Sequence, residues 1–151
     1  MANTQTIVKV FRVALLNGDH AFGTSVRTKD VFKAALYLAS ATMDATITAY
    51  TATGEVSGTG YSAGGIAVTN GTAPSNSGGT GIVAFWTPSA SLTYTTVTLS
   101  SSFDCFLLYN STTSGNPAVA VFTFGATTVT AGNFSITFPS NDLTNGLIRI
   151  S

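Results

Sequence analysis

The sequence predicts an all-β fold, a two-sheet β-sandwich with eight or nine short strands, and three observations lead to this prediction. The 151 residues include 26 Thr, a β-branched residue that suits the pleated surface of a sheet. Residues that favour helices are scarce, with a single Glu and three Lys. Short apolar runs alternate with turn residues, and no long stretch has helical periodicity. A β-sandwich or barrel is therefore the expected architecture.

The first half of the chain contains three predicted strands. Residues 6–16 form an apolar run that ends at an Asn-Gly-Asp turn signal. Residues 30–40 are predicted as a strand rather than a helix, because aromatic and branched residues lie at both ends. Residues 41–51 are expected to hold a helical turn or an irregular crossing, and residues 64–70 to form a strand.

The second half begins with residues 71–81, which lack apolar periodicity and are predicted as a flexible loop. The remaining strands, in chain order, are predicted over residues 82–86, 91–100, 103–110, 118–125, 133–139 and 146–151. The strands over 103–110 and 118–125 are expected to form a hairpin with a long loop between them. Residues 1–7 are predicted as an N-terminal arm, and residues 8–151 as one domain, since a chain of this length buries roughly 70% of its unfolded surface.

Charged residues make up 8% of the chain, about a third of the usual share in soluble domains. Residues 34–148 contain no Lys or Arg, and the basic residues of the first 33 positions are mixed with acidic ones. This pattern is too sparse for a nucleic-acid-binding stripe. A near-neutral chain is also poorly protected against self-association, which suits a subunit of an assembly. No signal peptide and no membrane span is predicted.

The stretch from Glu55 to Gly65 contains Gly58, Gly60 and Ala63, which fit the dinucleotide-binding pattern G-x-G-x-x-G/A. Such a loop must open a helix, and the residues that follow cannot start one. We therefore expect the glycines of this stretch to supply positive φ angles in a tight turn or bulge.

No catalytic or metal centre is predicted, and no cofactor is expected. His20 is the only histidine and follows Asp19, but a lone His beside a turn is typically a solvated or capped loop residue. One His and one Cys cannot complete a common zinc site, and Cys105 is expected to be a small buried hydrophobe. Four scattered acids, Asp44, Glu55, Asp104 and Asp142, leave a pair of glycosidase carboxylates as a minor alternative.

Most aromatic residues are predicted to pack in the core, because they occur at strand spacing among aliphatic residues. Tyr37, Tyr50 and Tyr61 lie near predicted loops and are candidates for partly exposed interface residues. A carbohydrate-binding module would instead expose a row of aromatics on one sheet.

The block "DVFKAALYLASATMDATITAYTATGEVSGTGYSAGG" resembles one that is common in structural proteins of tailed bacteriophages. The later segments "AVAVFTFG", "FSITFP" and "LIRIS" are similar to the closing strands of the same proteins. Within this group the chain looks like a head decoration, or cement, protein. That resemblance implies a jelly-roll sandwich on the outer capsid surface, which bridges major capsid protein subunits and has no catalytic motif.

The expected function is thus structural, in a virion, with the major capsid protein and further copies of this chain (a dimer or trimer) as partners. A phage tail or neck protein and a carbohydrate-binding sandwich are the alternatives. The predicted capsid contacts are the arm and the basic group: Ala2, Asn3, Thr4, Gln5, Thr6, Lys9, Arg12, Arg27, Lys29 and Lys33.

Overall fold

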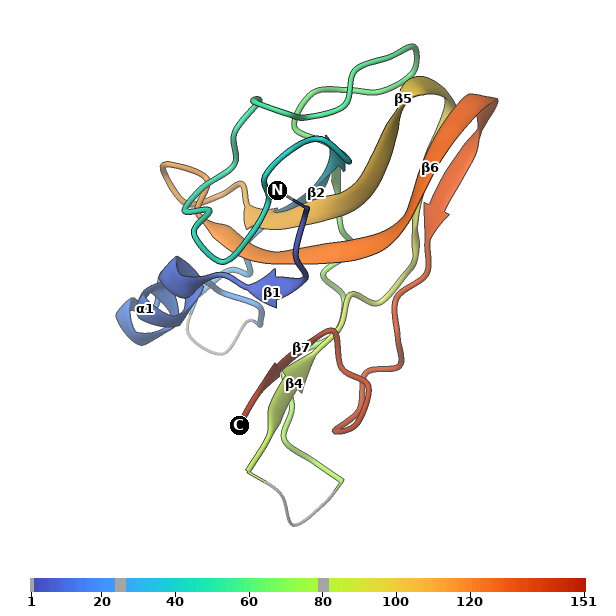
Figure 1. Cartoon of the computed structure of the whole chain (residues 1–151). Coiled ribbons are helices and arrows are strands. Elements are labelled where there is room, and N and C mark those ends of the chain that lie inside the picture. Colours follow the sequence, from blue (N-terminus) through green and yellow to red (C-terminus); the bar gives the residue numbers. More distant parts are fainter. Residues whose placement is uncertain (1, 24–26, 79–81) are drawn as a thin grey trace.

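The protein is mostly β-structure, as the sequence predicts, in a computed structural model that describes residues 2–23, 27–78 and 82–151 (Figure 1). The described residues contain one helix, α1 (Lys9–Asn17), and seven strands rather than eight or nine. The strands are β1 (Thr6–Ile7), β2 (Phe32–Leu38), β3 (Ile66–Ala67), β4 (Ala84–Trp86), β5 (Leu92–Asn110), β6 (Ala118–Ile136) and β7 (Ile148–Ile150).

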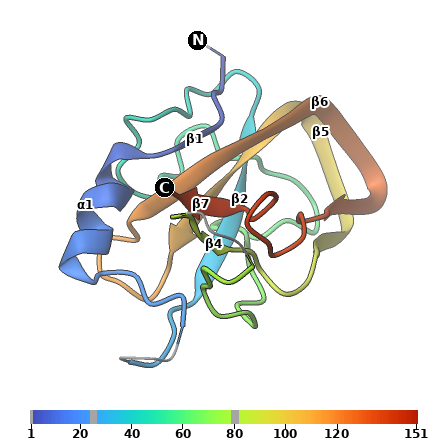
Figure 2. The same cartoon turned by 90° about the horizontal axis from the view of Figure 1, so that it is seen from below.

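The strands form two antiparallel sheets. The larger sheet has the order β1-β6-β5-β2-β3, and the smaller one pairs β4 with β7. The β4–β7 pair projects below the large sheet, and α1 lies at the edge of the molecule beside β1 (Figures 1 and 2).

The antiparallel pair of β5 and β6 is the centre of the large sheet. Each strand is 19 residues long, so two pairs of predicted strands, 91–100 with 103–110 and 118–125 with 133–139, are each one continuous strand. The predicted hairpin is confirmed, with residues 111–117 as its loop. Ser101–Ser102 and residues 126–132 are the segments between these predicted strands. Both segments belong to the continuous strands, because a register shift adds residues to one strand without ending the pairing.

The register shifts also bend the β5–β6 ribbon, which curves upward at one end in Figure 1. Thr96 and Ala131 have φ angles of 52° and 46°, an uncommon region for residues other than glycine. Thr96 lies where the pairing shifts between Tyr94 and Val97, and Ala131 lies where it shifts between Val97 and Leu99. The outer half of the ribbon contacts the glycine-rich segment, because the N–H of Thr98 donates to the carbonyl of Thr59 at 2.9 Å.

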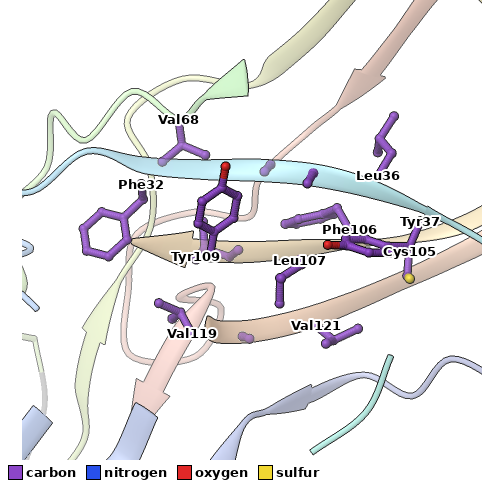
Figure 3. Packing of buried hydrophobic residues seen from close by; sticks show 14 of the residues in the cluster. Phe32, Leu36, Tyr37, Val68, Cys105, Phe106, Leu107, Tyr109, Val119 and Val121 are labelled. Atoms are coloured by element: carbon purple, nitrogen blue, oxygen red, sulfur yellow. The ribbon is translucent and has the colours of Figure 1, made fainter. Parts of the chain in front are cut away.

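The core is richest where β2, β5 and β6 lie side by side (Figure 3). The first part of β5 alternates between buried and exposed residues, whereas Cys105–Asn110 are all buried. This half of the strand is covered on both faces, and the apolar sequence "FLLY" is the expected signature of such a strand. The predictions that Cys105 is buried and that residues 30–40 contain a strand are confirmed.

The prediction of a strand over residues 6–16 is wrong beyond Ile7, because Lys9–Asn17 form helix α1. Phe11 and Ala14 are its buried positions, at helical rather than alternating spacing. The Asn-Gly-Asp signal is real but ends the helix: Gly18 has a φ of 74°, and the N–H groups of Gly18 and Asp19 donate to Leu15 and Ala14. These two bonds are those of a Schellman cap.

Three smaller differences concern the connecting segments. Residues 41–51 are an irregular crossing with one isolated bridge, from Ala49 to Pro117. The strands predicted over 64–70 and 82–86 are shorter, at Ile66–Ala67 and Ala84–Trp86. Part of the predicted loop over 71–81, residues 79–81, lies outside the described residues.

Candidate functional site

The carboxylate of Glu55 is the centre of a hydrogen-bonded cluster that holds the glycine-rich segment. It accepts hydrogen bonds from the hydroxyls of Tyr50 and Tyr61 and from the N–H of Gly64, each at 2.7 Å. Tyr61 also accepts a hydrogen bond from the N–H of Leu36 on β2, at 3.0 Å. We name Glu55, Tyr50, Tyr61 and Gly64 the Glu55 cluster; it ties residues 50–65 to the central sheet.

The prediction that the glycines form tight turns is confirmed, with one refinement. Gly60, Gly64 and Gly65 have positive φ angles, of 78°, 86° and 67°. Gly58 does not, and it is needed for a different reason: an added Cβ would lie 2.0 Å from the carbonyl oxygen of Thr98. No helix follows in residues 66–78, so the dinucleotide reading has no structural support.

The same segment contains a second pattern that the sequence reasoning missed. Residues 60–64 read Gly-Tyr-Ser-Ala-Gly, which fits the nucleophile-elbow pattern G-x-S-x-G. Such an elbow joins a strand to a helix, whereas here Ser62 lies on a turn that leads into the two-residue strand β3. The exposed Ser62 forms no side-chain hydrogen bond with His20, the only histidine of the chain. This match therefore does not extend to a Ser-His pair.

All five tyrosines use their hydroxyls inside the protein. Besides the two in the Glu55 cluster, Tyr37, Tyr94 and Tyr109 donate to the carbonyls of Thr51, Ala34 and Gly64. Burial and the hydrogen bond to Glu55 raise the pKa of Tyr50 to about 12, and burial raises the pKa of the other four as well. The proposal of Tyr37 as an interface residue is wrong, since its side chain is fully buried; Tyr50 and Tyr61 are half-buried.

Every Phe, Tyr and Trp is buried or half-buried, which confirms the prediction of core packing. The row of exposed aromatics expected of a carbohydrate-binding sheet is not found in the described part of the chain. Half-buried phenylalanines instead line a cavity of about 610 Å³ between the curved ribbon and the C-terminal segment. Its aromatic wall is formed by Phe106, Phe122, Phe124, Phe134 and Phe138.

The segment predicted as an N-terminal arm is packed against the domain from Asn3 onward. The Asn3 side chain donates to the carbonyl of Leu38 and to the carboxylate of Asp104, and accepts from the N–H of Met43. Thr6–Ile7 then pair with β6. Ordering of this segment therefore does not need a partner, although the side chains of Ala2, Thr4 and Gln5 are exposed.

The structure does not gather the five basic residues of the predicted contact surface into one patch. Lys9 and Arg12 lie on α1, Arg27 and Lys29 precede β2, and the half-buried Lys33 lies on β2. Arg27 forms an ion pair with Asp30, at 3.1 Å. Among the described residues the other four form no ion pair.

Helix α1 presents an outward stripe of four exposed residues: Lys9, Arg12, Val13 and Leu16. Their spacing of i, i+3, i+4 and i+7 places them on one face of the helix, opposite Phe11 and Ala14. Val13 is 59% exposed and Leu16 is 91% exposed, unusual values for large apolar side chains. We call this face the helix stripe.

His20 is buried, so the prediction that it is a solvated loop residue is wrong. It is only 9% exposed and lies among the rings of Phe11, Phe22 and Phe32. Its Nδ1 lies 3.1 Å from Nδ2 of Asn110, which also donates to the carboxylate of the buried Asp30 at 2.7 Å. Burial lowers the pKa of His20 below its usual 6.5, against the opposing effect of Asp30. We call His20, Asp30 and Asn110 the His20 cluster.

A second cavity, of about 450 Å³, lies between α1 and the β4–β7 pair. Its walls are mostly apolar and include Phe11, Phe22, Phe85, Trp86 and Ile148. His20 and Arg27 also line it. We call it the helix cavity.

The remaining candidate groups do not assemble into a reactive centre within the described residues. No group of three or more His, Cys, Asp or Glu side chains lies close enough there to hold a metal ion. Burial raises the pKa of the Cys105 thiol to about 12, and a protonated thiol is a poor nucleophile. No helix in the described part has the length and apolar character needed to cross a bilayer.

Comparisons of the chain with protein-family models, with curated proteins and with solved structures found no match.

The close approach of Gly65 to β2 predicts a large difference between two glycine substitutions. Gly65 and Gly115 both have positive φ angles, but an added Cβ at Gly65 would lie 1.7 Å from the carbonyl oxygen of Ala34, whereas Gly115 has open space. Gly115→Ala should cost only the left-handed backbone penalty of about 1–2 kcal/mol. Gly65→Ala should lower the free energy of unfolding, measured by urea denaturation, by more than twice that amount, or should prevent folding. Equal losses would contradict the proposed packing of the glycine segment on β2.

The burial of His20 predicts a stability that depends on pH. Because the pKa is lowered in the folded protein, the unfolded chain takes up a proton first as the pH falls, and this uptake favours unfolding. The free energy of unfolding should therefore decrease from pH 8 to pH 5.5, mainly below about 6.5. His20→Gln removes the only histidine and should flatten this profile. A wild-type profile that is flat or rises toward pH 5.5 would show that His20 is not buried in its neutral form.

Proposed function

We propose that the protein is a structural subunit of a tailed-bacteriophage virion, which decorates the outer capsid surface and bridges neighbouring major capsid protein subunits. The resemblance of residues 30–65 to phage structural proteins supports this proposal. The two antiparallel sheets are compatible with the jelly-roll sandwich that the resemblance implies, and that finer topology is part of the proposal.

The helix stripe is the observation that carries the proposal. Monomeric proteins rarely expose large contiguous apolar patches, and such patches commonly mark contact surfaces. The stripe combines Val13 and Leu16 with Lys9 and Arg12, two of the basic residues that the sequence analysis assigned to the capsid contact. It therefore fits a partner surface that offers an apolar depression with acidic groups around it, because such a surface complements both kinds of side chain.

A contact of this kind explains how decoration would stabilise a shell. A protein that binds only where assembled subunits meet shifts the equilibrium toward the assembled state by mass action. The apolar pair of the stripe contributes burial, at about 25 cal/mol per Å² of apolar surface removed from water. The two cations contribute orientation and selectivity more than affinity, because exposed ion pairs are weak. Self-association into a dimer or trimer would multiply such contacts on one particle.

The proposal predicts that changes on the helix stripe reduce binding to capsids. Undecorated heads would be prepared from phage that lack this chain and incubated with purified protein. The double variant Arg12→Glu/Leu16→Asp should lower occupancy at least tenfold, because it removes the apolar group that is 91% exposed and reverses one charge. Occupancy would be measured by cryo-electron microscopy and by quantitative gel analysis, and wild-type protein should raise the temperature of genome release.

The control is Arg149→Glu, which makes the same charge reversal as Arg12→Glu at an exposed position on β7, outside the helix stripe. This variant should bind like the wild type. Equal occupancy of the stripe variant and the control would exclude the helix stripe as the contact. Intact, fully stable heads with defective tail attachment, in phage that lack this chain, would instead assign the protein to the neck or tail.

A further inference from the structure

The helix cavity has the properties of a small-molecule site. Its volume of about 450 Å³ is within the range of roughly 300–1,000 Å³ that is usual for ligand pockets. Its walls are aromatic and aliphatic, as in most such pockets, and Trp86 in the wall is the only tryptophan of the chain. The cavity lies behind α1 rather than on the helix stripe, so it is independent of the proposed capsid contact.

The hydrogen bonds around Asn110 determine which nitrogen of His20 carries the proton. The Asn110 side-chain oxygen accepts from the N–H groups of Thr112 and Thr113, so its NH₂ group must be the one that faces His20. An amide NH₂ donates and does not accept. Nδ1 of His20 is therefore the unprotonated acceptor, and the neutral ring carries its proton on Nε2.

Nε2 of His20 has no hydrogen-bond partner among the residues that the structure describes. Two other buried side-chain atoms of the described residues are also unpaired, in Asn70 and Asn141, but neither residue lines the cavity. An unpaired buried donor destabilises the folded protein, and native proteins seldom leave one without a reason. Here the unpaired N–H belongs to a residue in the wall of an apolar cavity.

The charges at the cavity indicate what kind of acceptor fits. Arg27 lines the cavity, but its positive charge is paired with the buried carboxylate of Asp30, at 3.1 Å. The carboxylate of Asp30 also accepts hydrogen bonds from the N–H of Ala21 and from the side-chain NH₂ of Asn110, so its negative charge is already compensated. A ligand that brought a further charge into this apolar space would lose its hydration without gaining an unpaired counter-charge. A neutral acceptor is favoured.

We propose that the helix cavity binds a small, neutral, largely apolar molecule whose carbonyl or hydroxyl oxygen accepts a hydrogen bond from Nε2 of His20. The apolar body of the ligand would contact the rings of Phe11, Phe22 and Trp86. Nε2 has almost no exposed surface, so an acceptor reaches it once a neighbouring side chain changes rotamer, a common adjustment on binding.

Two matched pairs of probes test this proposal on the purified protein. Acetophenone and α-methylstyrene have nearly the same shape, but only acetophenone carries a carbonyl acceptor. Cyclohexanone and methylcyclohexane form the aliphatic pair. Binding would be followed by ¹H–¹⁵N NMR at the indole of Trp86 and the imidazole of His20. We expect a saturable shift with at least one carbonyl probe, at least about fivefold weaker binding of its hydrocarbon partner, and an Nε2-protonated imidazole before addition.

Two variants separate the cavity from the hydrogen bond. Ala84→Phe places a ring at an exposed position that lines the cavity and should weaken carbonyl-probe binding, whereas Ala90→Phe, at an exposed position outside it, should not. His20→Phe keeps an aromatic ring and should abolish the preference for the carbonyl probe. The proposal is overturned if neither carbonyl probe gives a saturable shift, if both members of each pair bind equally, or if the proton is on Nδ1.

Discussion

The hydrogen bonds to the carboxylate of Glu55 connect the irregular segment between β2 and β3 to the central sheet. The long segment between β2 and β3 has little regular structure and must satisfy its polar groups by other means. Glu55 accepts three hydrogen bonds at 2.7 Å, two of them from tyrosines, and one of these tyrosines also receives the N–H of Leu36. Hydrogen bonds to an ionised group are stronger than neutral ones, so one side chain can hold several turns in place. In a chain with a single Glu, this position has a structural role.

The β5–β6 ribbon provides the surface on which that segment rests. Register shifts bend the ribbon, and its buried tyrosines, Tyr94 and Tyr109, donate to backbone carbonyls of β2 and of the glycine segment. Gly58 and Gly65 then allow backbone to approach backbone more closely than any side chain would permit. The sheet, the tyrosines and the glycines therefore form one packed unit. The helix stripe and the helix cavity lie outside this packed unit, and they are the two features for which we propose binding.

The sequence was sufficient for the β class, for strand β2 and for the structural role of the glycines, because alternation and turn chemistry are local signals. It identified most of β5 and β6 as strand but divided each of them into two. It was misleading at α1, where a short run of branched residues suits either structure, and the contact with the sheet through Phe11 decides in favour of the helix. His20 was expected near the surface because it follows an Asn-Gly-Asp turn signal, and Tyr37 because it lies near a predicted loop. Their burial depends on Asn110 and Thr51, 90 and 14 residues away, and no local pattern contains that information. Of the helix stripe, the sequence indicated only the two basic residues, Lys9 and Arg12, as contact residues.

A double-mutant cycle between Glu55→Gln and Tyr61→Phe tests the central claim most directly. The cycle isolates the interaction between the two side chains from the separate hydrogen bond that Tyr61 receives from Leu36. Our account predicts a coupling free energy of about 1–2 kcal/mol in urea denaturation, within the range for residues of one hydrogen-bond network. The control cycle pairs Tyr61→Phe with Asp142→Asn, an exposed carboxylate that bonds only to Thr144 and Asn145, and it should be additive within about 0.5 kcal/mol. Additivity in the Glu55 cycle as well would contradict the claim that this carboxylate fastens the glycine segment to the sheet.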